Sequence, residues 1–427
     1  MKKLAILFAC FGLLSASGSM AQTAAPASNL NDWNFVLTPT FEQGDVKRGE
    51  TGKTNNLSVV GLNHSLQFAQ LLNNLVAGKT EHVRQVYAFN EKDTANSMAP
   101  VESIEPFALL NNLGVKTQTL NQGSTSTYNS PGYFVQNILA NQARGIYIMA
   151  MPDSVMQAIV KNLTGSTISK QDPNHYVVLS GHTGAFRVDT YSDHNQPSAQ
   201  YPAISLTQHS GCPQSPVTIK VKKPAHLKAY PSQSVYFVRH VEAHPNGNFE
   251  NGNYVCQGQW RALGANAILL KIMKDRKPDY VFTSNPSNII DGGDAYSYIR
   301  PALTIAPFAI QHDLPLTLAP FQWQDAEDLA EALFNKESPY FQGRKAGASI
   351  LVPWEHVHIE DSITYLLGTL YQDPKAAANI PTWDFQDYDT VWELSTDKNG
   401  DLEFKNTCEG ISTESLPTTC PAFFPAK

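Results

Sequence analysis

Residues 304–309 read TIAPFA, and residues 103–108 read SIEPFA, so one short pattern occurs twice in a chain of 427 residues. In both copies a leucine follows five residues after the alanine, at Leu113 and Leu314. Self-similarity at a fixed spacing is the sequence signature of a structural unit that is repeated. The pattern therefore predicts that the two halves of the chain share one fold.

Four further pairs of segments align in the same order on either side of this pattern. They are residues 61–72 with 258–269, 84–89 with 279–284, 145–165 with 347–368, and 176–188 with 391–404. The apolar periodicity of each copy predicts a strand, a long helix, a strand, a helix, a strand, a helix and a closing hairpin. Alternating strands and helices imply an α/β fold, with a mostly parallel sheet that helices flank on both faces.

The chain is predicted to divide into two tandem domains, residues 30–228 and 229–427. The segment between the copies, residues 210–234, is rich in Pro, Ser and Lys, which is typical of a linker. Four cysteines remain beyond the N-terminal segment and predict one or two disulfides, with three possible pairings: Cys212, Cys256, Cys408 and Cys420.

Residues 1–21 have the pattern of a secretory signal peptide. Lys2 and Lys3 precede the apolar run of residues 4–14, and Ser19-Met20-Ala21 is a suitable cleavage site. The run is shorter than the ~20 apolar residues that a membrane-spanning helix needs. We therefore expect a periplasmic or secreted protein without a membrane anchor. A net charge of −7 with both signs dispersed argues against a nucleic-acid partner.

An arginine and a histidine follow directly on a strand-like apolar run, residues 235–238. In an open α/β sheet, ligands bind outside the carboxyl ends of the strands. Arg239 and His240 are predicted to lie at that edge, which makes them candidates for a functional site.

The residues around this pair resemble the histidine phosphatase (phosphoglycerate mutase-like) superfamily. Its signature is Arg-His-Gly-Glu with an Asn four residues beyond the Glu, and this chain has RHVE at residues 239–242 and then Asn246. The resemblance implies that His240 is the nucleophile that receives the phosphoryl group. It also implies substrate contacts from Asn246 and Glu242. Val241 departs from the signature glycine.

The same resemblance assigns three later residues, over roughly residues 232–407. Arg300, which opens RPALTIAPFAI, is similar to the second phosphate-binding arginine. His356 is similar to the second histidine, which ends a later strand, with His358 as the alternative. An acidic proton donor is expected some twenty residues beyond the second arginine, where Asp325, Glu327 and Asp328 lie, and we favour Asp325. No metal or cofactor is implied, and the partner is a small-molecule phosphate ester.

These residue types suit phosphoryl transfer. The reaction needs an in-line nucleophile and cations around the equatorial oxygens of the transferred group. The guanidinium of arginine is permanently charged and binds two oxygens at once. We therefore predict an exported phosphatase that works through a phosphohistidine, and hydrolysis rather than mutase chemistry because phosphorylated metabolites are cytoplasmic.

The first copy lacks these groups. Leu37-Thr38-Pro39, within one residue, stands where the Arg-His pair stands, Ala99 replaces Arg300, and Asp153 replaces His356. A carboxylate repels a phosphate dianion. We predict that the first copy has no phosphatase activity and serves as a packing partner, a lid or a ligand-binding module.

Two other functions fit the same residues. The imidazoles of His240, His244, His356 and His358 could converge on zinc in a metal-binding hydrolase. Arg239 argues against this, because a fixed cation repels a metal ion. The other possibility is a secreted binding protein without catalysis.

Overall fold

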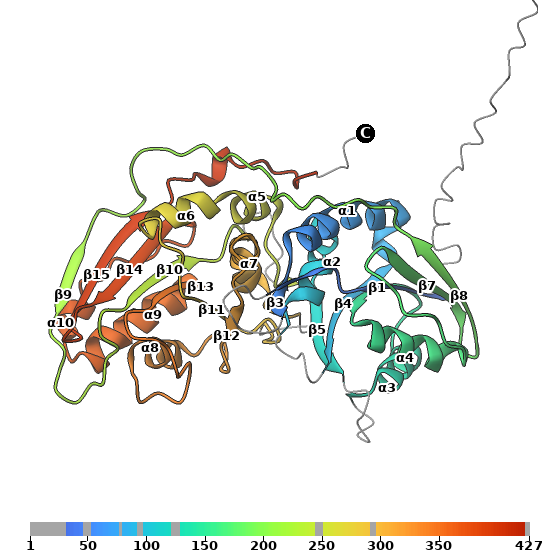
Figure 1. Ribbon diagram of the computed structural model, residues 1–427, viewed down its shortest axis with the longest axis horizontal. Coiled ribbons are helices and arrows are strands. Elements are labelled where there is room, and N and C mark those ends of the chain that lie inside the picture. The colour runs from blue at the N-terminus through green and yellow to red at the C-terminus, as the bar shows by residue number, and fades with distance from the viewer. Residues whose placement is uncertain are drawn as a thin grey trace, which may run out of the picture.

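The computed structural model of the chain describes residues 31–45, 53–76, 79–91, 97–120, 129–243, 251–290 and 296–422. Two sheets stand side by side, each accompanied by helices, with the blue-to-green half next to the yellow-to-red half (Figure 1). The predicted α/β fold with two similar units is confirmed. The predicted signal peptide lies outside the described residues.

The first half forms a six-stranded sheet and a separate two-stranded ribbon. Its elements are β1 (Trp33–Pro39), β2 (Gln43–Asp45), β3 (Lys53–Leu57), α1 (Val59–Leu75), β4 (Val83–Glu91), α2 (Ala99–Leu110), β5 (Val115–Leu120), α3 (Pro131–Asn141), β6 (Gly145–Met151), α4 (Asp153–Thr164), β7 (His175–His182) and β8 (Ala185–Ser192). The sheet order is β5-β4-β6-β1-β7-β8. The first four strands in this order are parallel, and β7 and β8 form the predicted antiparallel hairpin.

The second half repeats this plan. Its elements are β9 (Thr218–Val221), β10 (Ser234–Arg239), α5 (Cys256–Gly264), α6 (Asn266–Ile272), β11 (Tyr280–Thr283), α7 (Arg300–His312), β12 (Leu316–Leu318), α8 (Ala326–Phe334), β13 (Ser349–Trp354), α9 (His356–Tyr365), α10 (Pro374–Ala377), β14 (Thr390–Thr396) and β15 (Leu402–Cys408). The sheet order is β12-β11-β13-β10-β14-β15-β9. Strands β12, β11, β13 and β10 are parallel, and β14 and β15 form the hairpin.

Backbone hydrogen bonds at the end of the central strand show which residues of the two halves correspond. The amide of Thr40 donates to the carbonyl of the last residue of β6 at 3.0 Å, and the amide of His240 donates to that of β13 at 2.8 Å. Thr40 therefore corresponds to His240, and Pro39 to Arg239. The sequence alignment, which placed Leu37-Thr38-Pro39 opposite the Arg-His pair within one residue, is therefore shifted by one residue.

A hydroxyl group ties the strand end to a helix in the same way in both halves. The amide of Val241 donates to the hydroxyl of Thr304 at 3.0 Å, and this hydroxyl donates to the carbonyl of Arg300 at 2.8 Å. In the first half the amide of Phe41 donates to the hydroxyl of Ser103 at 3.1 Å, and this hydroxyl donates to the carbonyl of Ala99 at 2.7 Å. Ala99 thus stands where Arg300 stands, as predicted.

The domain boundary at residue 228 needs correction. Strand β9 precedes this residue, yet it pairs antiparallel with β15 and completes the second sheet. The predicted linker therefore contains a strand of the second unit, and a division before Thr218 keeps both sheets whole. Lys and Thr residues around a short β-branched run gave β9 the composition of a linker.

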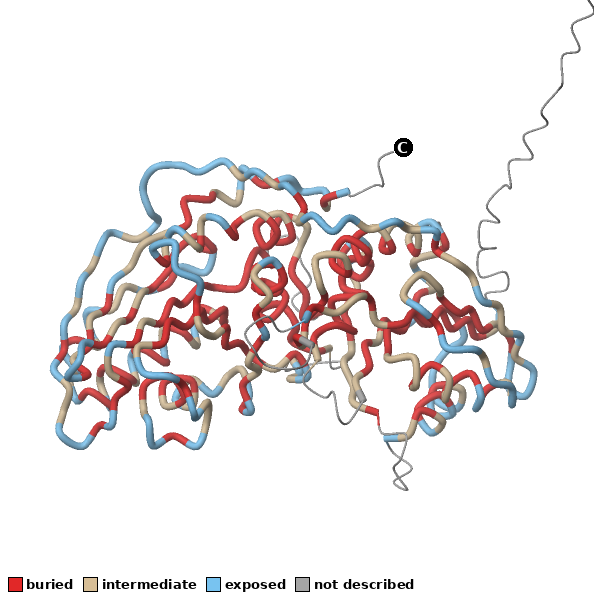
Figure 2. The backbone as a smooth tube through the Cα atoms, viewed as in Figure 1, coloured by how far each residue is buried: buried red, intermediate tan, exposed pale blue. Residues whose placement is uncertain are grey.

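The two halves contain three apolar cores, and they share one of them. Each half has its own core on one face of its sheet, and a third core contains residues of both, among them Leu66, Ile104, Leu263 and Leu303. Figure 2 shows buried backbone through both sheets and at the junction between the halves. Asn55 adds two hydrogen bonds to the backbone of Leu316, at 2.7 and 2.8 Å. In the described part of the chain, no helix has both the length and the apolar character needed to cross a bilayer.

Two disulfides, Cys212–Cys408 and Cys256–Cys420, close loops of 196 and 164 residues. A crosslink over a long loop restricts the unfolded chain, so we expect the double variant Cys256→Ser/Cys420→Ser to lose about 2–5 kcal/mol of unfolding free energy. Thermal unfolding with and without dithiothreitol measures this. The parent should lose stability on reduction. A control variant with serine in place of Cys212, Cys256, Cys408 and Cys420 should not. An unfolding midpoint of the parent that is insensitive to reductant would contradict the prediction.

Candidate active site

Four side chains that the sequence singles out meet at one edge of the second sheet. Arg239 ends β10, His240 follows it, Arg300 begins α7, and His356 begins α9. Because β10 and β13 are parallel neighbours, their carboxyl ends lie together. Exposed fractions of 3, 2, 3 and 6% show that the four residues, which we call the buried cluster, are shielded from solvent. One detail differs from the prediction, because His356 lies in the first turn of a helix and not at a strand end.

His240 is held in a defined orientation. Its Nδ1 lies 2.8 Å from the carbonyl oxygen of Val241. A carbonyl only accepts hydrogen bonds, so Nδ1 carries the proton and Nε2 has a free lone pair. Burial, and then the charges of Arg239 and Arg300, hold the pKa of His240 well below its usual value of 6.5. The imidazole is therefore neutral at physiological pH and has an unprotonated nitrogen available for attack.

Arg239 is fixed by the segment before β14. Its Nη1 donates to the carbonyls of Phe385 at 2.5 Å and Asp387 at 3.1 Å. Its guanidinium lies 4.0 Å from the centre of the Tyr388 ring, a cation–π distance. These contacts orient the group without neutralising its charge. Burial lowers the pKa of Arg239, although the group remains a cation at any physiological pH.

The arginines of the buried cluster have donors that no described residue uses. Nε and Nη2 of Arg300 and Nε of Arg239 are buried and have no hydrogen-bond partner among the described residues. Burying a charge without a partner is costly, and buried donors in folded proteins are nearly always satisfied. Burial accordingly lowers the pKa of Arg300 as well. Three unsatisfied N–H donors on two cations indicate a site for an anion with several acceptor oxygens.

Glu355 is the acidic residue at the buried cluster, and sequence reasoning missed it. Its Oε1 lies 2.5 Å from Nδ1 of His356 and its Oε2 lies 2.6 Å from Nδ1 of His358. Oε2 also accepts from the amide of His358 at 3.1 Å, so Glu355 caps α9. Burial acts to raise the pKa of Glu355, but the two imidazole contacts outweigh it and hold the pKa well below its usual range. The carboxylate is therefore ionised, and it aligns both rings.

Glu242 does not contact the candidate anion site. Its carboxylate is fully buried and accepts from Nε and Nη2 of Arg261, the latter at 2.6 Å. Thr413 donates to it as well, at 2.9 Å. Both oxygens are thus satisfied by protein donors. The prediction that Glu242 binds substrate is corrected, since it forms a structural ion pair.

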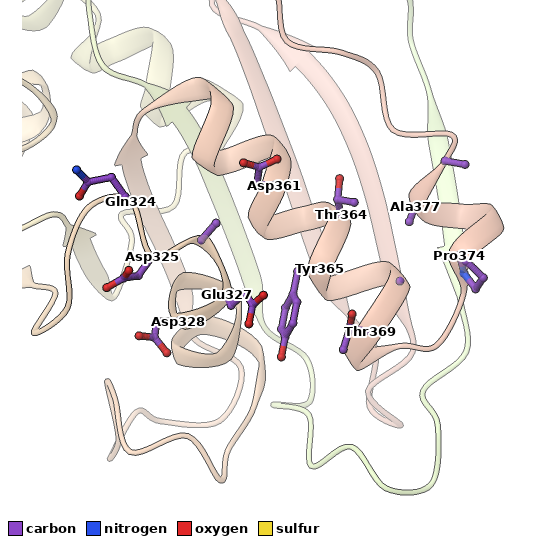
Figure 3. A pocket seen from close by; sticks show the side chains of 13 residues that line it. Gln324, Asp325, Glu327, Asp328, Asp361, Thr364, Tyr365, Thr369, Pro374 and Ala377 are labelled. Carbon is purple, nitrogen blue, oxygen red and sulfur yellow. The ribbon is translucent and has the colours of Figure 1, made fainter. Parts of the chain in front are cut away.

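Asp325 faces a different region. It is exposed, and its Oδ2 accepts from the amide of Gln322 at 3.0 Å. Figure 3 shows it with Glu327 and Asp328 at the start of α8, opposite Asp361 on α9, in a groove of about 920 Å³. No residue of the buried cluster lines this groove. Because the acids there would repel a phosphate ester, we withdraw Asp325 as proton donor.

Two predicted residues, His244 and Asn246, lie outside the described residues. The zinc hypothesis needs His244 together with three other imidazoles. In residues 31–422, apart from the undescribed gaps, no group of three or more His, Cys, Asp or Glu has the spacing of a metal site. Nδ1 of His358 is also engaged by Oε2 of Glu355 at 2.6 Å, and Nδ1 of His356 lies 2.5 Å from Oε1 of the same carboxylate.

At the equivalent edge of the first sheet, Pro39, Thr40, Ala99 and Asp153 occupy the four corresponding positions. None of these side chains is a cation. The carboxylate of Asp153 accepts from the amide of Gln171 at 2.7 Å and so stabilises the loop after α4. None of these four residues would neutralise a phosphate dianion.

Comparisons with known proteins give solved structures only. No family model matches the chain, and no curated protein matches its sequence. The protein histidine phosphatase SixA complexed with tungstate matches with 12% identity and a TM-score of 0.27, over 38% of this chain and 97% of that one.

Two further matches are enzymes from protozoa. Phosphoglycerate mutase from Plasmodium falciparum matches with 16% identity and a TM-score of 0.26, over 45% of this chain and 98% of that one. A phosphoserine phosphatase variant from Entamoeba histolytica, in complex with phosphoserine, matches with 11% identity and a TM-score of 0.23, over 43% of this chain and 100% of that one.

Proposed function

We propose that the second half is an exported phosphatase that transfers the phosphoryl group of a phosphate monoester to His240 and then hydrolyses the phosphohistidine. The observation that supports this most strongly is the set of three unsatisfied N–H donors on Arg239 and Arg300, beside an imidazole with a free Nε2. A phosphoryl group supplies acceptor oxygens for these donors and an electrophilic phosphorus for the nitrogen.

In the first step the lone pair of Nε2 attacks phosphorus while the bond to the ester oxygen breaks. The proton on Nδ1 remains on the bond to the carbonyl of Val241, so the phosphorylated ring is a cation stabilised by that acceptor. Arg239 and Arg300 bind the equatorial oxygens, which carry the spreading negative charge. Removing one such preorganised donor typically costs about 2.7–4 kcal/mol of transition-state stabilisation.

In the second step water attacks phosphorus, the P–N bond breaks, and inorganic phosphate leaves. The electron pair of the broken bond returns to Nε2, which restores the neutral imidazole, and the proton of the water passes to a phosphate oxygen. His356, whose Nδ1 lies 2.5 Å from Oε1 of Glu355, can contact the transferred group through Nε2. The ionised Glu355 acts as a positioning residue for this ring.

We infer a packing role for the first half. It lacks cations at the corresponding positions, and it contributes apolar side chains to the core that both halves share. Two disulfides support an oxidising location outside the cytoplasm.

Hydrolysis of p-nitrophenyl phosphate by the purified full chain tests the proposal. We expect turnover that continues in the presence of a chelator and is inhibited by vanadate, which mimics the transferring phosphoryl group. Activity that disappears with chelator and returns with zinc would support the metal-binding hydrolase instead. If neither this nor any other phosphate ester is hydrolysed, the remaining function is that of a non-catalytic binding protein.

The low pKa of His240 has a measurable consequence. We expect its imidazole to remain neutral, with the proton on Nδ1, as the pH falls from 8 through 6.5, because burial and two guanidinium groups oppose protonation. Two-dimensional ¹⁵N–¹H NMR of histidine-labelled protein follows the ring, with His240→Gln to identify its signals. As the pH falls through 6.5 the unfolded state takes up a proton that the folded state does not, so this residue contributes a loss of stability in acid. A midpoint at or above pH 6.5 for this ring would contradict the prediction.

A further inference from the structure

Three exposed apolar side chains belong to segments that are linked to the buried cluster by sequence or by contact. Among the described residues five large apolar side chains are exposed, and three of them are Ile289, Val357 and Phe385, at 49, 47 and 46%. Val357 lies in the first turn of α9, directly after His356. Single exposed apolar residues are ordinary on protein surfaces, but several beside one site mark a place that a ligand covers.

Phe385 forms one side of this apolar rim. Its ring lies 5.9 Å from the ring of His356 in an edge arrangement, and 5.6 Å from the guanidinium of Arg239. The same residue therefore contacts two members of the buried cluster while nearly half of its surface faces solvent. A group that extends outward from a bound phosphoryl group would meet this ring.

Aromatic rings line the way from His240 to the other side of the rim. Tyr298 lies 6.4 Å from His240, edge to face, and Trp323 lies 4.3 Å from Tyr298. Trp323 also lies 5.0 Å from the ring of His358, and its indole N–H donates to the carbonyl of Ile289 at 3.2 Å. Two ring contacts and one hydrogen bond to a backbone carbonyl thus connect His240 with Ile289.

We infer that the substrate is the phosphate ester of a phenol. This inference rests on the proposed function and specifies its substrate class. The buried cluster accommodates the phosphoryl group, and the aromatic ring of the leaving group packs against Phe385 and Val357 at the rim. Edge and offset contacts between rings at such distances stabilise a complex beyond the burial of area alone.

The charge of Glu355 supports the same substrate class independently of the rim. Among the described residues it is the carboxyl group whose oxygens contact the buried cluster, and its ion pairs with His356 and His358 keep it ionised. A carboxylate cannot protonate a departing oxygen. An alkoxide leaves slowly without such a proton, whereas a phenol, with a pKa of about 10, leaves more readily as the anion.

Three substrates separate the effect of the ring from that of leaving ability. Phenyl phosphate has the ring, acetyl phosphate has a good leaving group without a ring, and glycerol 3-phosphate has neither. For the parent enzyme we expect kcat/KM to be at least about tenfold higher for phenyl phosphate than for glycerol 3-phosphate. The double variant Val357→Ser/Phe385→Leu should lower the ratio of kcat/KM for phenyl phosphate over acetyl phosphate by about tenfold, mainly through KM.

Two outcomes would overturn the inference. The first is a ratio of kcat/KM, phenyl phosphate over acetyl phosphate, that differs by less than twofold between the variant and the parent. Phe385 would then act only through Arg239 and would affect both substrates alike. The second is a parent enzyme that prefers glycerol 3-phosphate. In either case hydrolysis dependent on His240 would persist and the proposed function would stand. If the parent hydrolyses neither these three substrates nor p-nitrophenyl phosphate, the proposed function itself fails.

Discussion

Replacing His240 by glutamine should lower kcat/KM for p-nitrophenyl phosphate by at least about 10³-fold, because the proposed nucleophile of the covalent intermediate would have no substitute in the site. Glutamine can keep the hydrogen bond to the carbonyl of Val241, so folding should be little affected. Steady-state kinetics measures the loss, and the thermal midpoint reports whether the variant is folded.

His312→Gln is the matched control, since this histidine ends α7, whereas Arg300 begins it. Its kcat/KM should stay within about twofold of the parent, as expected for a substitution away from the chemistry. If folded His240→Gln retains more than a tenth of the parent activity, His240 is not the nucleophile.

Replacing Arg261 by methionine lowers the unfolding free energy by about 3–5 kcal/mol, because it leaves buried carboxylates without their cation. Arg261 is 1% exposed and donates to Glu242 at 2.6 Å and to Glu409 at 2.8 Å. Burial alone would lower the pKa of Arg261, and these carboxylates more than offset it. Urea denaturation of the full chain, followed by tryptophan fluorescence, measures the difference.

Arg187→Met provides the comparison. Arg187 also pairs with a carboxylate, that of Asp189 at 2.6 Å, but 74% of its side chain is exposed. Water screens exposed ion pairs, so we expect no appreciable change in stability for this variant. An Arg261→Met protein as stable as the parent would show that the buried pair with Glu242 does not support the fold.

The repeat in the sequence predicted the two-unit fold for a reason visible in the structure. Ser103 and Thr304 open the motifs SIEPFA and TIAPFA, and each hydroxyl bridges the strand end to the helix start. The motif therefore contains a tertiary contact that both halves need. The edge strands β5 and β12 were missing from the prediction because β12 is short and β5 is polar, reading VKTQTL.

The positions of Arg239, His240, Arg300 and His356 could be predicted because strand ends and helix starts are encoded locally. The partners of the acidic side chains could not be predicted from the sequence. Glu242 turns toward Arg261, a residue of another helix, and the sequence gives no sign of this pairing. Glu355 interacts with two histidines within three residues of itself. The acid just before His356 was the one available signal, and it was overlooked in favour of a more distant acidic helix face.

The measurement that tests the central claim most directly is the isolation of the phosphorylated enzyme. The full chain is mixed with acetyl [³²P]phosphate, quenched in alkali within milliseconds, digested, and its labelled peptide sequenced by mass spectrometry. We predict an acid-labile, alkali-stable label on His240 that saturates with donor concentration and is absent from His240→Gln. Active enzyme without label, or with label that persists in the variant, would contradict the account.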